Sequence, residues 1–228
     1  MVGTGHRVLD LGCGTGAISG AIRAAGNHVT GVDMSEGSIA IARERVDAAH
    51  VHDIQDVRGI AEKTGGKFDT LIFSDILEHL VEPGPVLARC RTLLVPGGRA
   101  LISVPNVAAW TIRLSLLFGW WEYTDTGIMD RTHLRFYTRT TARRMIEQAG
   151  YRVARSGVTP LMVRAIWPFI KSWIGRKEPT FDPAAVLKSP AYRAYQKYVE
   201  PVETVVAGIL PGLLACQCVF EALPEDAG

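Results

Sequence analysis

The chain has 228 residues, of which 47% are hydrophobic and 21% charged, and its formal net charge at neutral pH is +2. This length accommodates one α/β domain with a full core, and two independent domains would be cramped. A charge balance this mild does not indicate a nucleic-acid or membrane partner. No run reaches about 18 uninterrupted apolar residues, so no transmembrane segment is expected.

The first residues and the cysteines indicate a cytoplasmic protein. The segment from Met1 to Arg7 is too short and too polar for a secretory signal peptide. The four cysteines fit no zinc-binding spacing, and Cys216 and Cys218 alternate along one predicted strand. We therefore expect reduced thiols in the cytoplasm.

The first half of the sequence alternates short apolar segments with helical patterns. Ser35 is expected to cap one of the helices, and Pro83 to open another. Alternation of this kind predicts right-handed crossovers and a doubly wound, mostly parallel sheet in the α/β class. The predicted strands of this half are residues 7–11, 28–32, 49–54, 68–73 and 99–104.

The second half departs from this rhythm. Residues 107–134 are predicted to be irregular and, with three tryptophans, to face the substrate. A helix at 140–149 and strands at 151–158 and 215–223 follow. We expect a single domain over residues 1–228, with a helical insertion at 159–213 between the last two strands. The insertion carries two apolar stripes, Trp167, Ile170, Trp173 and Ile174, and then Tyr192, Tyr195, Val199, Val202 and Val206.

The sharpest motif is Asp10-Leu-Gly12-Cys-Gly14-Thr-Gly16, between a strand and a helix. Glycines there let the backbone turn tightly and let a ligand lie against bare main chain. Asp10 would repel a pyrophosphate but suits the ammonium and sulfonium charges of S-adenosylmethionine. Asp33 ends the second strand, where a carboxylate can accept hydrogen bonds from both ribose hydroxyls. An NAD site shares that last feature, so a dinucleotide ligand stays open as a distant alternative.

Four segments resemble successive motifs of the class I S-adenosylmethionine-dependent methyltransferases, and a fifth resembles their small-molecule O-methyltransferase-like subgroup. The four are residues 7–16, 31–35, 68–79 and 96–98, and the fifth is residues 133–138. The resemblance implies a seven-stranded Rossmann-like sheet whose last strand is inserted antiparallel. Such proteins usually carry a helical segment before the first strand. Here either the chain starts late or the insertion supplies that cover.

The resemblance also implies the ligand and its contacts. The cofactor would be S-adenosylmethionine, leaving S-adenosylhomocysteine as product. Asp53 would accept a hydrogen bond from the adenine amine, Ile54 would pack on the ring, and Ser74 would line the methionine end. The remaining expected cofactor-binding residues are Asp10, Gly12, Gly14, Gly16, Asp33 and Met34.

Methyl transfer to a hydroxyl requires alignment of the acceptor and removal of its proton. His79, His133, Asp130 and Asp125 are candidate bases. We expect His133 to be the base, because it follows the aromatic stretch and its ordinary pKa suits proton removal. Asp130 or Asp125 would orient it. The alternative is that His133 donates to a backbone carbonyl and fixes the loop.

A metal site is a less favoured alternative. If residues 75–79 form a helical turn, then Asp75, Glu78 and His79 share one face. Carboxylate and imidazole ligands suit a divalent ion that lowers the pKa of an acceptor hydroxyl. The segment resembles a magnesium site of ubiquinone-pathway O-methyltransferases.

The sequence thus predicts an O-methyltransferase whose acceptor is a saccharide, a glycolipid or a related natural product. An N- or quinol O-methyltransferase and a non-catalytic cofactor-binding assembly partner remain alternatives. Nucleic-acid methylation is disfavoured, since residues 74–77 lack the tetrad of base-amine methylators. The insertion is expected to form extra core or a homodimer face, a lid over the acceptor, or a weak membrane-surface contact.

Overall fold

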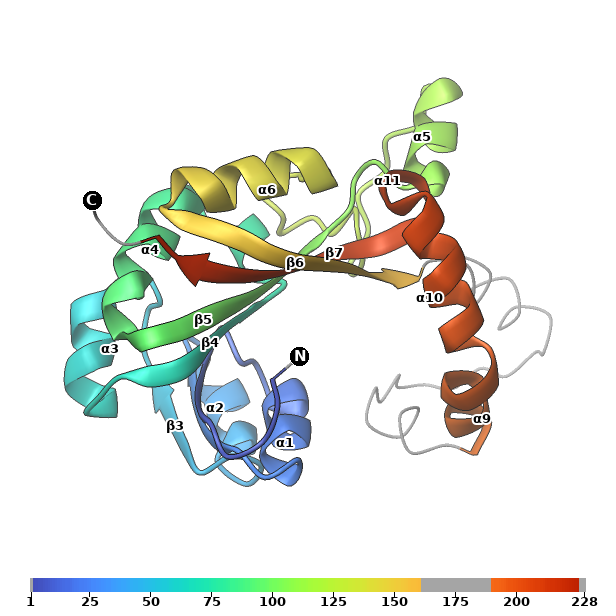
Figure 1. The fold of residues 1–228 in the computed structure, drawn as a ribbon. Coiled ribbons are helices and arrows are strands. Elements are labelled where there is room, and N and C mark those ends of the chain that lie inside the picture. The colour runs from blue at the N-terminus through green and yellow to red at the C-terminus, as the bar shows by residue number, and fades with distance from the viewer. Residues whose placement is uncertain (1, 161–189, 226–228) are drawn as a thin grey trace.

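The computed structural model describes residues 2–160 and 190–225, which form a seven-stranded sheet with helices on both faces (Figure 1). The strand order is β3-β2-β1-β4-β5-β7-β6. β7 runs antiparallel to both β5 and β6, and the remaining pairs are parallel. The predicted fold class and the antiparallel last strand are confirmed.

The strands follow the predicted apolar segments, except that β5 begins five residues before the predicted start at residue 99. They are β1 (Arg7–Leu11), β2 (His28–Asp33), β3 (Ala48–Val51), β4 (Phe68–Ser74), β5 (Leu94–Pro105), β6 (Tyr151–Pro160) and β7 (Ala215–Pro224). The third strand is shorter than predicted, because its apolar pattern is weak. Asp53 and Ile54 therefore lie in the turn that follows it.

The helices begin where local signals place them. Ser35 accepts a hydrogen bond from the amide of Ser38 and caps α2, Pro83 opens α4, and Thr138 caps α6. The helices of the first 150 residues are α1 (Ala17–Ala24), α2 (Glu36–Ala42), α3 (Val57–Thr64), α4 (Pro83–Cys90), α5 (Trp110–Leu117) and α6 (Arg139–Gln148).

Two apolar cores lie on opposite faces of the sheet. The larger one packs β-strand residues such as Leu9 and Phe73 against α3, α4 and α6, through Ile60, Leu87 and Ile146. The smaller one packs the other face against α2. Figure 1 shows α3, α4 and α6 apart from α1 and α2, with the sheet between the two groups. The loops after β1 and β4 meet at the switch in strand order, where ligands bind in such folds.

The prediction that residues 107–134 are irregular is wrong in part, because α5 lies within them. Its apolar side chains are distributed all round the helix, so the sequence shows no one-sided helical stripe there. None of its residues is buried, and Figure 1 shows it projecting from the sheet. Tertiary burial therefore does not explain this helix.

The described part of the insertion contains three helices, α9 (Pro190–Tyr198), α10 (Glu200–Ile209) and α11 (Pro211–Leu214). The second predicted stripe is largely uncovered, with Val202 62% exposed and Val199 and Val206 less so. The first stripe, at 167–174, lies outside the described residues. No helix among residues 2–160 and 190–225 is long and apolar enough to cross a membrane.

An ion-pair network ties the three last strands of the sheet together. Glu221 of β7 binds Arg155 of β6 at 2.6 Å and Arg99 of β5 at 3.4 Å, and its side chain is almost fully buried. The Arg155 hydrogen bond is the main reason why the pKa of Glu221 is lowered. A carboxylate with a depressed pKa stabilises the fold above its unfolded-state pKa and loses that contribution as the pH falls through the folded-state value.

We expect Glu221→Gln to lower the free energy of unfolding by about 1–3 kcal/mol at pH 7, because it leaves two guanidinium groups without their carboxylate. Urea unfolding at neutral pH measures this loss. The difference from the parent protein should shrink as the pH falls from the ordinary glutamate pKa of about 4.3 through the lower folded-state pKa of Glu221, because protonation removes the charge that the two arginines bind. Glu147→Gln removes only an exposed pair with Arg143 and should change little. A difference in the free energy of unfolding that does not change with pH would contradict the electrostatic explanation.

Candidate active site

The glycine loop after β1 is held against the end of β2 by backbone hydrogen bonds. The amides of Gly12 and Cys13 both donate to the Val32 carbonyl, at 2.8 and 3.0 Å. Gly12, Gly14 and Gly16 all have positive φ, which a side chain would oppose. The loop then leads directly into α1. The sequence motif therefore forms the tight strand–helix turn that it predicts.

Gly12 and Gly14 differ in what lies beside them. A Cβ at Gly12 would lie 2.5 Å from Cγ1 of Ile76, so the loop backbone packs directly on the turn after β4. A Cβ at Gly14 would meet no atom within 4 Å. The open space at Gly14 is where a ligand can lie against bare main chain.

Two carboxylates flank this loop. Asp33 accepts from the amide of Gly14 through Oδ2 and from the amide of Ser35 through Oδ1, each at 2.9 Å. Each oxygen retains a second lone pair for a ligand hydroxyl. Asp10 is buried beneath the loop, where Ser19 donates to Oδ2. Its Oδ1 has no hydrogen-bond partner among the described residues.

Burial raises the pKa of Asp10 to about 6, with the Ser19 hydrogen bond opposing the shift and the Asp33 charge adding to it. A positive charge close to the loop would offset that burial penalty. This arrangement fits a cationic ligand that carries a ribose. It combines an Asp10 oxygen without a hydrogen-bond partner in the described part of the chain, open space beside Gly14 and a hydrogen-bond acceptor at Asp33.

The other predicted cofactor contacts lie around this loop. Met34 is 68% exposed next to Asp33. Asp53 is half-buried and accepts from the amide of Gln55, whereas Ile54 is buried in the larger core. Ser74 lies at the end of β4, with Oγ 3.4 Å from that of Ser103. The structure gathers these residues at one edge of the sheet, and their individual roles stay predictions.

The turn after β4 brings three titratable side chains together. Glu78, His79 and His133 each offer a ligand atom, and these atoms lie within 4.8 Å of one another. Glu78 is 1% exposed, and neither of its carboxylate oxygens has a hydrogen-bond partner in the described part of the chain. Burial raises its pKa to about 8, and the charges of Asp75 and Asp130 act in the same direction.

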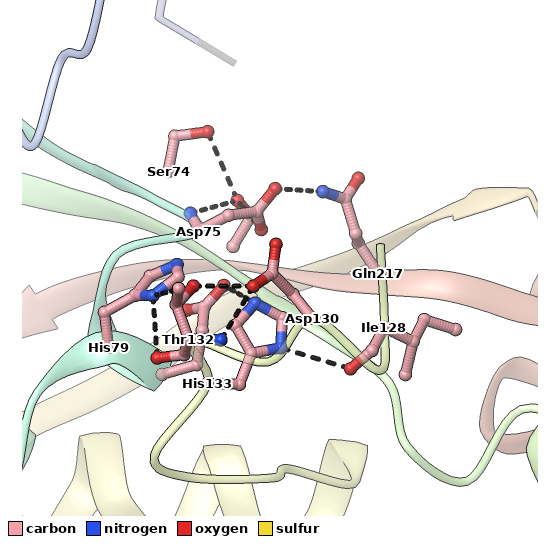
Figure 2. A network of polar contacts seen from close by, with 10 residues as sticks. Ser74, Asp75, His79, Ile128, Asp130, Thr132, His133 and Gln217 are labelled. Atoms are coloured by element: carbon pink, nitrogen blue, oxygen red, sulfur yellow. Dashed lines mark hydrogen bonds and ion pairs between the residues drawn. The ribbon is translucent and has the colours of Figure 1, made fainter. Parts of the chain in front are cut away.

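The tautomer of His133 follows from its contacts. Nδ1 lies 3.1 Å from the carbonyl oxygen of Ile128, which can only accept, so Nδ1 carries the proton (Figure 2). Nε2 then presents its lone pair 3.9 Å from Oε1 of Glu78. Burial lowers the pKa of His133. The hydrogen bond to a backbone carbonyl, expected as the alternative role of His133, is therefore formed, and it leaves Nε2 available.

The carboxylates expected to orient His133 bind other groups. Asp130 accepts from the hydroxyl and the amide of Thr132, at 2.6 and 2.8 Å, and Asp125 pairs with Arg131 at 2.7 Å. Thr132 in turn lies 3.2 Å from Nδ1 of His79, through both its hydroxyl and its carbonyl oxygen. Asp130 thus supports the loop beside the two histidines. It reaches the ring of His79 through Thr132, and its charge opposes the lowering of the His133 pKa by burial.

Asp75 does not belong to the group of possible ligands formed by Glu78, His79 and His133, although its charge adds to burial in raising the pKa of Glu78. The helical turn is a short 3-10 segment, Leu77–His79, that begins after Asp75, and Asp75 itself has a φ of 50°. Its carboxylate binds Ser103 and Gln217. No sequence pattern pointed to Gln217, which lies 142 positions away, or to the approach of His133 to Glu78.

An aromatic group adjoins the cluster. The ring of Phe136 lies 6.2 Å from that of His133 and 5.5 Å from that of Trp121, which in turn is 6.3 Å from Tyr123. Trp121 and Tyr123 are 40% and 51% exposed. These three aromatic residues, Trp121, Tyr123 and Phe136, form an aromatic platform beside His133.

A family model described as a methyltransferase domain matches residues 3–156. The chain belongs to the class I methyltransferase family. The cofactor of this family is S-adenosylmethionine, and the open cradle at Gly14 with Asp10 and Asp33 beside it fits that molecule.

Relatives of this methyltransferase-family chain carry a more specific name. This chain is 38% identical over 159 residues to a ubiquinone biosynthesis O-methyltransferase of Aromatoleum aromaticum. The match covers 66% of this chain and 65% of that protein. A protein of the same name from Pseudomonas aeruginosa is 36% identical over 105 residues, 45% of each chain. The chain thus matches less than two thirds of the length of these relatives.

A solved S-adenosylmethionine-dependent methyltransferase from Archaeoglobus fulgidus has the same fold. It superposes with a TM-score of 0.58 over 96% of this chain and 86% of its own, at 17% identity. At that identity the likeness establishes the architecture alone.

The two loop glycines provide a matched pair of variants. Gly12→Ala should lower the free energy of unfolding by about 2–3 kcal/mol or more, since a strained φ is combined with overlap on Ile76. Gly14→Ala should cost only about 1 kcal/mol, because its Cβ enters open space. The cofactor is predicted to lie in that open space, so Gly14→Ala should weaken S-adenosylhomocysteine binding about tenfold or more, measured by calorimetry. Unchanged binding in a folded Gly14→Ala protein would contradict the position of the cofactor.

Proposed function

We propose that this chain transfers the methyl group of S-adenosylmethionine to a hydroxyl oxygen of a small ring-bearing acceptor. The observation that carries the proposal is the direct packing of the cofactor loop on the turn that bears Glu78 and His79. The contact between Gly12 and Ile76 supports one compact site in which methyl donor and proton acceptor are neighbours.

The acceptor is best described as a phenol or quinol. The exposed rings of Trp121 and Tyr123 can stack on a planar ring and guide its hydroxyl toward His133. The matched relatives are named for ubiquinone biosynthesis, which favours the quinol alternative over the saccharide or glycolipid acceptor first predicted. The comparisons give a saccharide acceptor no support.

The protein groups have separate tasks in this reaction. The glycine loop and Asp33 align the methyl donor, and the aromatic platform aligns the acceptor, so that the in-line geometry is set before reaction. His133 presents the lone pair of Nε2 for the hydroxyl proton, because Nδ1 is committed to Ile128. Asp130 holds Thr132, which positions the ring of His79.

Glu78, His79 and His133 also fit a divalent ion. A buried carboxylate without a hydrogen-bond partner is costly unless a cation or proton compensates it, and two imidazoles adjoin it. A bound divalent ion would lower the pKa of a coordinated acceptor hydroxyl. Relative to the set first predicted, His133 takes the place of Asp75. The Nε2 lone pair of His133 can bind the ion or accept the hydroxyl proton but cannot do both, so the metal and the His133 base are alternative mechanisms.

Methyl transfer to catechol or hydroquinone acceptors, followed with S-adenosylmethionine labelled in its methyl group, tests the proposal. We expect turnover with these phenols and at least about tenfold less with simple saccharides, since sugars lack a flat aromatic ring. His133→Asn should reduce turnover by about 10²-fold or more while S-adenosylhomocysteine affinity stays within about twofold. A saccharide preference would overturn the acceptor assignment, and near-normal turnover of His133→Asn would overturn the role of that residue.

Chelation tests the divalent ion separately. The metal alternative predicts that EDTA abolishes turnover and that added magnesium or manganese restores it, while cofactor binding stays unchanged. Asp125→Asn is the matched control, because it removes an exposed carboxylate that pairs with Arg131 outside the cluster and should keep the metal response. Activity that is indifferent to chelator would remove the metal and leave His133 as the base.

A further inference from the structure

The turn after β4 has an unusual backbone at Asp75. Its φ of 50° lies in the left-handed region, where asparagine and aspartate are the side-chain-bearing residues most readily tolerated. The Asp75 amide donates to the carbonyl oxygen and the hydroxyl of Ser103, each at 3.2 Å. The left-handed conformation is therefore held from the neighbouring strand β5.

The carboxylate of Asp75 is held from two strands. Ser103 Oγ of β5 donates to Oδ1 at 2.9 Å, and Gln217 Nε2 of β7 donates to Oδ2. Figure 2 shows the Asp75 side chain turned toward Gln217. A strand from the end of the chain thus reaches a residue only three positions before Glu78.

The amide orientation of Gln217 follows from Thr159 on β6. The Thr159 hydroxyl accepts from the backbone amide of Gln217 at 3.1 Å, so it can donate its own proton to Oε1 of Gln217, 2.9 Å away. Oε1 therefore faces Thr159, and Nε2 faces Asp75. The chain of donors and acceptors runs in one direction from β6 through β7 to the turn.

We propose that Gln217 and Ser103 are positioning residues for methyl transfer, which hold Asp75 and thereby fix the turn that carries Glu78 and His79. The proposal rests on the proposed function, since it assigns these residues to the same site. Asp75 acts here through its hydrogen bonds and not as a ligand. Movement of this turn would also shift Ile76 against Gly12. The hydrogen bonds to Asp75 therefore align the turn after β4 and the glycine loop after β1 together.

An exchange of donor and acceptor tests this arrangement. Gln217→Glu places two carboxylates together, and Asp75→Asn places two amide donors together, while both changes preserve size. In the double variant the new amide at position 75 donates to the new carboxylate at position 217. That carboxylate still accepts from Thr159, and the amide oxygen at position 75 still accepts from Ser103. The side-chain hydrogen bonds that join positions 75, 103, 159 and 217 are thereby restored, with donor and acceptor reversed between positions 75 and 217.

We expect each single variant to lose about tenfold or more in kcat, with the KM for S-adenosylmethionine changed less than about threefold, because misplacement of reacting groups affects rate before binding. The double variant should recover most of kcat. Hydrogen exchange of peptides covering residues 74–80 should be faster in each single variant and normal in the double variant. The control is Ser156→Ala on β6, which removes a hydrogen bond to Arg139 and should leave all these quantities unchanged.

The two readouts separate the two proposals. Hydrogen-exchange rates of residues 74–80 that do not change in the single variants, or that do not return to normal in the double variant, would contradict the proposed role of Gln217 and Ser103 in holding the turn. If the double variant recovers normal hydrogen exchange but not kcat, the Asp75 charge acts directly on the reacting groups. That outcome would also contradict the positioning role. A parent protein that binds S-adenosylhomocysteine and methylates no hydroxyl acceptor, with exchange still following the variants, would refute the proposed function and leave the hydrogen-bond tether standing.

Discussion

The backbone of Gly12 packs against Ile76 with no room for a methyl group between them, and the geometry of the site depends on this contact. Gly12 belongs to the loop after β1, and Ile76 to the turn after β4, which are adjacent strands of the parallel sheet. Because parallel strands end at the same edge, their loops meet there. The contact sets the distance between the glycine loop proposed to hold the cofactor and the residues proposed to accept a proton.

The interior beside this contact departs from the ordinary rules of a stable core. Asp10 and Glu78 are buried carboxylates with oxygens that lack hydrogen-bond partners among the described residues. Such groups reduce stability unless a charge or a proton compensates them. They lie beside the two loops joined by Gly12 and Ile76. Buried carboxylates that destabilise the fold and gather at the carboxyl ends of the parallel strands are typical of a binding site, where a ligand supplies the missing partners.

The antiparallel end of the sheet has a second role besides closing the fold. β7 places Glu221 between two arginines, which joins β5, β6 and β7, and the same strand presents Gln217 to Asp75. The pairing of β7 with β5 and β6 therefore helps to fix the turn after β4, which lies far earlier in the sequence. The aromatic platform adjoins His133, and the segment that follows α5 leaves Trp121 and Tyr123 exposed there.

The sequence by itself determined the parallel core, the glycine turn and the placement of Asp10 and Asp33. These features depend on local signals, namely apolar strands, positive φ at glycines and helix caps such as Ser35, which act within a few residues. Helix α5 escaped prediction because its apolar residues do not form one stripe.

Only the tertiary structure brought His133 to Glu78 and joined Gln217 to Asp75. Each of these pairs is separated by tens of residues or more, and the spacing of a single sequence does not encode which distant side chains the strand order will bring together. Even the short-range choice of Asp130 for Thr132 rather than for a histidine ring was decided by the path of the loop. The sequence therefore determined the glycine loop proposed to hold the cofactor, and the packing of distant strands and loops decided which side chains gather around Glu78.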